Sequence, residues 1–189
     1  MNKKILLISG TPASGKDTLT NLLCQKDKRF THFKKHKMGE SGRIDDTYIF
    51  VDKETFNSMA DNEEFIQYHY RYERGYAVAF SQLQVCWSKG LIPVIHVGKY
   101  ENIAAFYNQQ DVEICSLLLL VDKETTKERL ALRHPGDEKQ IAERLQSYNE
   151  ERKELAELIN SGDSLLFDYI INNSNSPDKT LKAIKKICF

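Results

Sequence analysis

The sequence has no excess of charge of either sign. Its 27 Lys and Arg side chains are balanced by 27 Asp and Glu side chains, so the formal net charge is zero. A strong overall positive field, of the kind that attracts nucleic acid or an anionic membrane, is therefore excluded. We expect no nucleic-acid partner and no membrane partner, and any anion must bind to a local cluster of basic groups.

Long hydrophobic runs and cysteine motifs are also missing. The opening "MNKKILLISG" has too short an apolar run for a signal-peptide core, and no later stretch approaches a membrane span in length. Cys24, Cys86, Cys115 and Cys188 have no C-x-x-C or metal-ligand spacing, and three of them lie in apolar sequence, where free Cys packs as a small hydrophobe. These absences predict a soluble, cytoplasmic protein with free cysteines.

Strand-like and helix-like segments alternate along the chain, and no repeat, low-complexity tract or linker divides its 189 residues. Short apolar runs predict buried strands, and longer segments with helical spacing separate them. The predicted strands are 3–9, 91–97, 113–121 and 168–172, and the clearest helices are 17–25, 141–159 and 177–187. This alternation predicts an α/β fold with a mainly parallel sheet, five-stranded and flanked by helices. The polar, aromatic segment 31–76 predicts a small inserted β-rich module.

The stretch "GTPASGKDT" follows the first predicted strand and precedes the first predicted helix. A phosphate-binding P-loop reads G-x-x-x-x-G-K-[ST] in this same context. Gly10 and Gly15 permit the turns that aim backbone N–H groups inward, and Lys16 supplies a positive charge for phosphates. We therefore predict that this loop binds a nucleotide, with these contacts: Gly10, Thr11, Pro12, Ala13, Ser14, Gly15, Lys16, Asp17 and Thr18.

Asp17 stands where a P-loop normally has a hydroxyl side chain, and Thr18 follows one place later. A carboxylate here can face Mg²⁺, because Mg²⁺ prefers carboxylate and water oxygens. The alternative is that Asp17 caps the helix while Thr18 meets the phosphate. Both interpretations stay open from the sequence.

Taken in order, these features resemble the nucleoside monophosphate kinases, and most of all the guanylate kinase family. The segments that carry the resemblance are the P-loop at 10–18, "YIFVDKETFNSMADNEEFIQY" at 48–68, "LLLLVDKETTKERLALR" at 117–133 and "ERLQSYNEE" at 143–151. The resemblance implies a single P-loop kinase domain with ATP and Mg²⁺ as cofactors. Its core would span 1–30 and 77–189, its acceptor-binding module 31–76 and its helical lid 126–144.

The resemblance also implies roles for individual residues. Lys16 and three lid arginines would be catalytic: Arg129, Arg133 and Arg144. Asn173 would help to hold the adenine of ATP, although Asn172 is an equal candidate by spacing. The acceptor would meet Lys35, Lys37, Arg43, Tyr48, Gln67 and Tyr76, and Asp17 would be the residue on the side of the metal.

The sequence departs from the family pattern where the guanine base would be read. Gln67 replaces an acidic side chain, Val78 replaces a small hydroxyl residue, and Gly98 replaces an aspartate. His96 stands where a further acid of the same strand would lie. Because a mispaired polar group costs about 1–3 kcal/mol, these changes put GMP specificity in doubt.

The sequence thus predicts an ATP-dependent phosphotransferase that acts on a nucleoside monophosphate or a similar phosphorylated small molecule. A different class of function is a guanylate-kinase-like binding module that has lost catalysis and holds a peptide or nucleotide.

Overall fold

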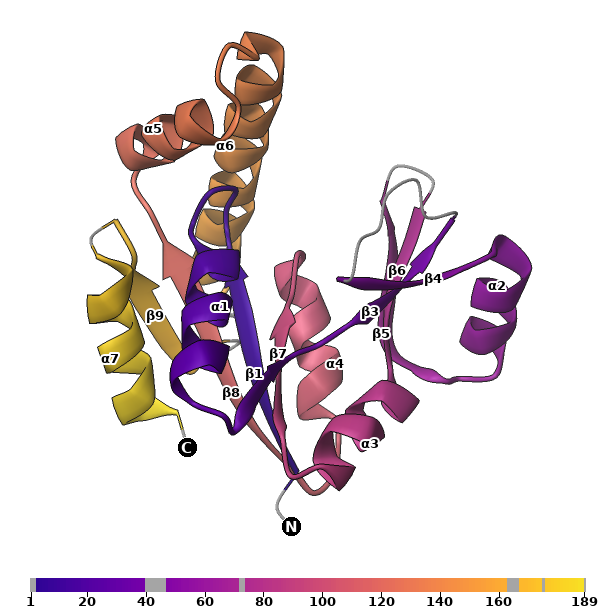
Figure 1. The fold of residues 1–189 in the computed structure, drawn as a ribbon. Helices are drawn as coiled ribbons and strands as arrows, with labels where there is room; N and C mark the ends of the chain where they lie inside the picture. Colours follow the sequence, from indigo (N-terminus) through magenta and orange to yellow (C-terminus); the bar gives the residue numbers. More distant parts are fainter. Residues whose placement is uncertain (1–2, 40–46, 72–73, 163–166, 175, 189) are drawn as a thin grey trace.

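The central sheet consists of parallel strands (Figure 1). The computed structural model describes residues 3–39, 47–71, 74–162, 167–174 and 176–188. Within these ranges the sheet has the order β2-β7-β1-β8-β9, and each neighbouring pair runs parallel. The strands are β1 (Lys3–Gly10), β2 (Phe30–His32), β7 (Ile92–His96), β8 (Val112–Leu120) and β9 (Tyr169–Asn172).

Helices cover both faces of this sheet, because β1 is apolar on both sides. Its side chains alternate between the faces, as they do in any strand. Leu6 and Ile8 pack against α1 (Lys16–Lys26) and α7 (Pro177–Ile187). Ile5 and Leu7 pack on the opposite face, against α3 (Phe80–Ser88), the 3₁₀ turn η1 (Tyr100–Ile103) and α4 (Ala104–Tyr107). Leu155 of the long helix α6 (Glu138–Asn160) joins that face.

A second sheet lies to one side of the first (Figure 1). Its order is β4-β3-β6-β5, with β4 (Tyr48–Val51), β3 (Lys35–Met38), β6 (Arg74–Ala79) and β5 (Phe65–Arg71). Helix α2 (Lys53–Asp61) begins at a cap in which Asp52 accepts from the Thr55 N–H at 2.7 Å. Phe56 of α2 is fully buried against this sheet, and a Cβ on Gly75 would lie 2.6 Å from its ring. Glycine at 75 is therefore required for α2 to pack this closely.

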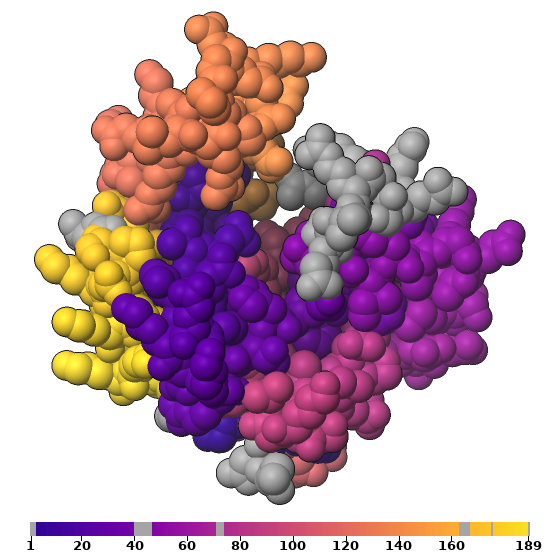
Figure 2. Space-filling model, in the orientation of Figure 1, coloured from indigo at the N-terminus to yellow at the C-terminus, as the bar shows by residue number. Residues whose placement is uncertain are grey.

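Helix α5 (Lys123–Arg133) and the first part of α6 stand beyond the end of β1 (Figure 1). Both helices begin at aspartate caps: Asp122 accepts from the Thr125 N–H at 2.7 Å and Asp137 from the Gln140 N–H at 3.0 Å. Figure 2 shows these helices rising above the P-loop, apart from the second sheet. The space between them is the cleft described below.

The α/β architecture with a parallel central sheet and flanking helices is confirmed. Strand β2 was not predicted, because three residues are too few to show a periodicity. Helix α3 was not predicted either, since "FSQLQVCWS" mixes apolar and polar residues in a short element. The division of the chain into core, acceptor module and lid remains a prediction.

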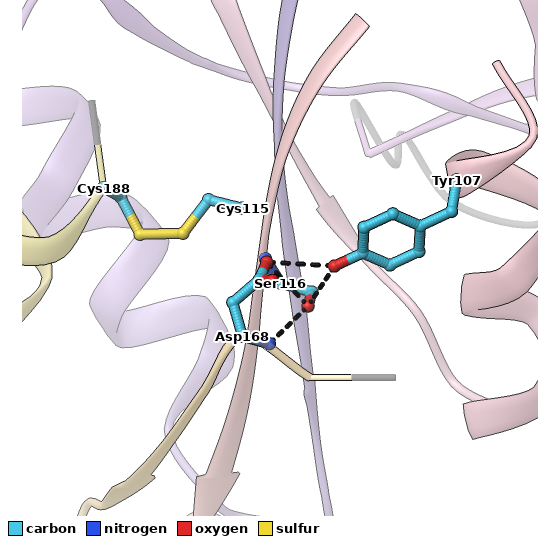
Figure 3. The surroundings of a disulfide bond; sticks show 5 residues. All are labelled: Tyr107, Cys115, Ser116, Asp168 and Cys188. Carbon is cyan, nitrogen blue, oxygen red and sulfur yellow. Dashed lines mark hydrogen bonds between the residues drawn. A yellow bond between two sulfur atoms is a disulfide. The ribbon is translucent and has the colours of Figure 1, made fainter. Parts of the chain in front are cut away.

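One expectation from the cysteines is wrong. Cys115 of β8 and Cys188 after α7 form a disulfide across 73 positions of sequence, while Cys24 and Cys86 are free and partly buried (Figure 3). The two cysteines meet because α7 packs on the face of β8 that carries Cys115. The spacing of the cysteines in the sequence does not reveal this contact. Cysteine usage therefore no longer argues for a reducing compartment.

Beside the disulfide, Asp168 ties the start of β9 to β8 (Figure 3). Its Oδ2 accepts from the Ser116 N–H at 2.7 Å, from the Ser116 hydroxyl at 3.1 Å and from the Tyr107 hydroxyl at 2.9 Å. Burial is the main cause that raises the pKa of Tyr107 to about 12.

Among the helices described, none is both long and apolar enough to cross a bilayer.

Candidate active site

The loop between β1 and α1 has the geometry that a phosphate cradle requires. Gly10 and Gly15 have φ values of 152° and 91°, which favour glycine. A Cβ on Gly15 would also lie 2.6 Å from Asn173 Nδ2. The hydroxyl of Thr11 is buried and has no hydrogen-bond partner among the described residues. A buried hydroxyl without a partner is free to bind a water or a ligand oxygen.

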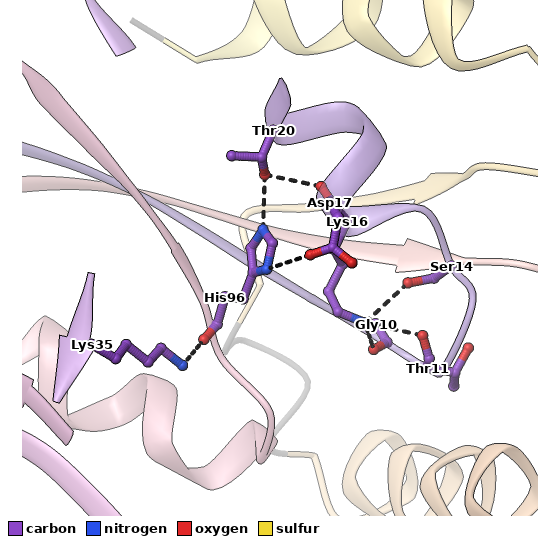
Figure 4. Close-up of polar contacts among 8 residues, drawn as sticks. All are labelled: Gly10, Thr11, Ser14, Lys16, Asp17, Thr20, Lys35 and His96. Atoms are coloured by element: carbon purple, nitrogen blue, oxygen red, sulfur yellow. Dashed lines mark hydrogen bonds and ion pairs between the residues drawn. The ribbon is translucent and has the colours of Figure 1, made fainter. Parts of the chain in front are cut away.

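Lys16 lies at the centre of this loop (Figure 4). Its ammonium donates to the Gly10 carbonyl, to the Thr11 carbonyl at 3.0 Å and to the Ser14 hydroxyl at 3.3 Å. Burial lowers the pKa of Lys16, while the charges of Glu151 and Asp17 act in the opposite direction. The structure therefore holds the predicted lysine against the phosphate loop by three hydrogen bonds.

Asp17 and Thr18 face different cavities. The Asp17 side chain is 72% exposed and borders a cavity of about 430 Å³ together with Thr20, Lys35 and His96. Thr18 borders a separate cavity, also of about 430 Å³, with Arg129 and Asn173. A Mg²⁺ ion on nucleotide phosphates needs only one or two carboxylates, with water for the rest. An exposed carboxylate beside Lys16 fits such an ion, and the choice between Asp17 and Thr18 stays a prediction.

His96, at the end of β7, contacts the first turn of α1 (Figure 4). Its Nδ1 lies 3.4 Å from Asp17 Oδ1, and its Nε2 lies 2.8 Å from the Thr20 hydroxyl. Burial is the main cause that lowers the pKa of His96 to about 4, and the Asp17 charge acts in the opposite direction. Thr20 was not singled out in the sequence, because a Thr inside a helix is ordinarily a packing residue.

The three predicted lid arginines occupy different places. Arg129 donates to the Ala13 carbonyl at 3.1 Å and to the Asn173 carbonyl at 2.7 Å, so it clamps the P-loop. Arg133 and Arg144 border a cavity of about 310 Å³ over the loop, together with Lys16. The structure thus brings two of the arginines to the face of the loop where phosphate would lie.

Asn173 is 1% exposed and connects three elements. Its Nδ2 donates to the Ser14 carbonyl at 2.7 Å, and its Oδ1 accepts from the Thr180 hydroxyl of α7 at 2.6 Å. Asn172 instead accepts from the Ser174 N–H at 2.9 Å on the exposed side. Asn173 also borders the cavity that Thr18 and Arg129 line. Its contact with a base stays a prediction.

Three of the six predicted acceptor residues line one wall of a cleft of about 790 Å³ that also reaches Lys16, Arg144 and His96. Lys35, Tyr48 and Tyr76 border this cleft. Lys35 donates to the His96 carbonyl, and burial followed by the charge of Lys16 lowers its pKa to about 8.

Lys37 and Gln67 are not among the residues that line the cleft. The Lys37 ammonium sits over the rings of Tyr48, Phe50 and Tyr76 at 4.6, 5.3 and 5.5 Å from their centroids. Gln67 is buried, and its Nε2 lies 3.0 Å from His69 Nδ1. Arg43 falls outside the described residues.

Of the opposite wall of the cleft, sequence reasoning found only Arg144. One face of α6 supplies this wall, through Gln140, Glu143, Arg144, Ser147 and Glu150. These positions follow the three-to-four residue spacing of a helix face, a signal present in the sequence. His69 also borders the cleft, and it stacks on Tyr76 at 5.6 Å between ring centroids.

Comparisons with known proteins agree with this architecture. The family model for guanylate kinase matches residues 2–189. A guanylate kinase of Mycoplasmopsis pulmonis is 26% identical over 98% of this chain and 93% of its own length. A guanylate kinase of Prochlorococcus marinus is 25% identical over 98% of this chain and 96% of its own length. The crystal structure of guanylate kinase from Anaplasma phagocytophilum superposes with a TM-score of 0.63 at 19% identity, covering 97% of this chain and 82% of that chain.

Proposed function

Because this chain belongs to the guanylate kinase family, we propose that it transfers the γ-phosphoryl group of ATP to a nucleoside monophosphate. One observation carries the proposal. A single cleft of about 790 Å³ joins Lys16, on the side of the phosphate loop, to Tyr48 and Tyr76 of the second sheet. Two phosphorylated ligands can therefore meet end to end inside it.

Phosphoryl transfer depends on alignment and on neutralisation of charge more than on a base. On the donor side we assign ATP to the loop 10–18, with Lys16 on its phosphates and Asn173 near its adenine. Mg²⁺, when bound, neutralises phosphate charge, and Asp17 is the residue proposed to face it. Arg133 and Arg144 border the cavity above the loop, where their guanidinium groups would stabilise the group in transfer.

On the acceptor side we assign the monophosphate to Lys35, Lys37, Tyr48 and Tyr76. The two lysines supply positive charge, and the two hydroxyls supply donors. The three aromatic rings around the Lys37 ammonium hold it in one place. A lysine is a point charge with less directional preference than an arginine fork, so tolerance of different acceptors is expected. Arg43 is a further candidate from the sequence.

We propose that GMP is a poor acceptor. Gln67 can offer one acceptor oxygen, and its amide nitrogen is already engaged at 3.0 Å from His69. Val78 is buried in the apolar core, so it offers no polar contact to a base. Gly98 borders the cleft without a side chain. The acceptor we favour is another nucleoside monophosphate, or a similar phosphorylated small molecule.

We also propose that the second sheet and the helices α5 and α6 close over the two ligands. Closure excludes water, which would otherwise accept the phosphoryl group. We place the reaction in the cytoplasm, where ATP is supplied.

The test is thermal unfolding with ATP and Mg²⁺ and with a panel of monophosphates, followed by measurement of ADP release for each stabilising pair. We expect ATP to raise the unfolding temperature and at least one monophosphate to stimulate ADP release. Stabilisation by ATP without turnover on any acceptor would favour a binding module. Efficient use of micromolar GMP would contradict the assignment of Gln67, Val78 and Gly98.

A further inference from the structure

The hydroxyl of Thr20 determines which ring nitrogen of His96 carries the proton (Figure 4). Thr20 donates its single hydrogen to the Lys16 carbonyl at 2.9 Å, a contact that threonine often makes inside a helix. Its oxygen is therefore the acceptor in the 2.8 Å contact with Nε2 of His96. An uncharged imidazole has one N–H, so Nδ1 has a lone pair and no proton.

The unprotonated Nδ1 of His96 faces the Asp17 carboxylate. The distance from Nδ1 to Oδ1 is 3.4 Å, and neither atom carries a hydrogen that could join them. Two acceptors that face each other are stabilised only by a donor or a cation that lies between them. Both side chains also border the cavity of about 430 Å³ next to α1. The pair therefore presents one nitrogen ligand and one oxygen ligand side by side.

The separation of the two atoms suits one shared ion. Divalent ions bind histidine nitrogen and carboxylate oxygen at about 2.0–2.2 Å. Two ligands at about 2.1 Å from an ion lie about 3.0 Å apart at a right angle and about 3.4 Å apart at a tetrahedral angle. The observed 3.4 Å between Nδ1 and Oδ1 falls within this range.

This pair needs further ligands to hold an ion. In the described part of the chain, no group of three or more His, Cys, Asp or Glu side chains could bind a metal. Lys16 and Lys35 also border the large cleft beside His96, and their charges oppose a bare cation. Nucleotide phosphates would supply oxygen ligands and negative charge, and Asp17 directly follows the lysine of the phosphate loop. We therefore expect the ion to bind together with the nucleotide.

We propose that Nδ1 of His96 and the carboxylate of Asp17 together bind the divalent ion of ATP, and that this site prefers Mn²⁺ or Co²⁺ to Mg²⁺. The inference rests on the proposed function and names its metal. Mg²⁺ favours oxygen ligands, whereas the affinity of a mixed nitrogen and oxygen site rises from Mn²⁺ to Co²⁺. A histidine where the family pattern has an acid thus changes the preferred ion and keeps the metal site.

Pulsed electron paramagnetic resonance of bound Mn²⁺–ATP tests the nitrogen ligand directly. The protein is labelled with ¹⁵N in its histidines alone, so a ¹⁵N coupling cannot come from the adenine. We expect this coupling in the wild type and its loss in His96→Asn. His32→Asn is the matched control, because His32 is an exposed histidine that borders the same cavity. That variant should keep the coupling.

Calorimetry measures the preference between ions. The dissociation constant of ATP is determined at saturating Mg²⁺ and at saturating Co²⁺, and the ratio of the two values is compared between proteins. His96→Asp replaces the nitrogen ligand by oxygen and should lower the ratio of the Mg²⁺ value to the Co²⁺ value at least about 10-fold. His32→Asn should leave the ratio unchanged. Since Lys35 contacts the main-chain oxygen of residue 96, substitution of the His96 side chain keeps that bond.

The outcomes distinguish this inference from the proposed function. If the wild type binds Mn²⁺–ATP without a histidine coupling, the metal assignment is overturned and the kinase assignment stands. A ratio that His96→Asp leaves unchanged also overturns the metal assignment. If the wild type binds no ATP with Mg²⁺, Mn²⁺ or Co²⁺, both fall together.

Discussion

Two lysines share the cleft, and their surroundings differ in a way that matters for activity. Lys16 is held by the phosphate loop through three acceptors. Lys35 is partly buried, and its pKa is lowered to about 8, first by burial and then by the charge of Lys16. Burial also lowers the pKa of Lys16, and the pKa of Lys35 lies within the range of ordinary alkaline buffers.

Replacement of Lys16 by alanine removes the positive charge at the centre of the phosphate loop. We expect kcat/KM to fall by about 10²–10³-fold, the loss typical of one preorganised donor, with the fold retained. ADP release and circular dichroism of Lys16→Ala measure the two effects. Lys26→Ala, which removes an exposed ion pair with Asp178, is the matched control. Unchanged turnover in Lys16→Ala would remove this lysine from the mechanism.

The pKa of Lys35 predicts a pH dependence of acceptor binding. The ammonium is present below about pH 8 and is lost as the pH rises through that value. We therefore expect KM for the acceptor to rise between pH 7 and pH 9, with KM for ATP less affected. Lys35→Arg keeps its charge at all these pH values and should flatten the profile. A wild-type profile that matches Lys35→Arg would show that Lys35 does not bind the acceptor.

The lowered pKa of Lys35 also affects stability. Rising pH is expected to weaken acceptor binding, but it should increase the free energy of unfolding. Because the folded protein releases this proton near pH 8 and the unfolded chain holds it to about pH 10.4, the unfolded chain binds more protons in that window. Stability then rises with pH, so far as this group is concerned. The protein thus keeps a charged lysine in the cleft at some cost to its free energy of unfolding.

At the level of elements, the phosphate loop is supported from both sides by segments distant in sequence. Asn173, just after β9, binds Ser14 and Thr180, and Arg129 of α5 binds Ala13. The loop itself could be predicted from its glycines and lysine, because that motif is local. The contacts that Asn173 and Arg129 make with this loop could not be predicted, since no spacing rule links position 14 to position 173.

Asn173→Ala should weaken both stability and ATP binding. It leaves the Ser14 carbonyl and the Thr180 hydroxyl without their buried partner, at about 1–3 kcal/mol for each unsatisfied group. Denaturant unfolding and ATP titration measure the two losses. Asn172→Ala removes an exposed turn contact and should change the free energy of unfolding by less than about 0.5 kcal/mol. Equal effects from the two asparagines would contradict the role of Asn173 as a support.

The three lid arginines should separate into two classes. Arg129→Ala breaks two charged hydrogen bonds to main-chain carbonyls and should destabilise the protein by about 1.5–3 kcal/mol. Arg133→Ala and Arg144→Ala should lower kcat and leave the unfolding midpoint in place. Paired unfolding and kinetic measurements test this division. It fails if all three variants lose stability alike.

At the scale of the whole molecule, the central sheet could be predicted from the sequence. Contacts between elements that are distant in sequence could not. Buried strands such as β1 and β8 are continuous apolar runs, and their neighbours in a parallel sheet follow from the alternation with helices. The second sheet could be anticipated only as a β-rich segment, because β3 pairs with both β4 and β6. The cleft wall on α6 and the disulfide both depend on how distant elements pack.

Reduction of the Cys115–Cys188 bond should lower stability throughout the central sheet. A loop of 73 positions gives about 4 kcal/mol in the chain-entropy account, or roughly 10 °C in unfolding temperature. Thermal unfolding with and without a phosphine reductant measures the difference, with Cys86→Ser as the control. Labelling of the denatured, unreduced protein should find two reactive thiols, Cys24 and Cys86. Four reactive thiols would show that the bond does not form in solution.

The contact between Asn173 and Ser14 spans 159 positions, and this has a consequence during synthesis. A ribosome makes the glycine-rich turn early, yet the amide that braces it arrives only after β9 has been translated, and the hydroxyl of Thr180 later still. A growing chain therefore holds an incomplete cradle for most of its elongation. Chains that stop short of this point should therefore bind ATP more weakly than the complete chain.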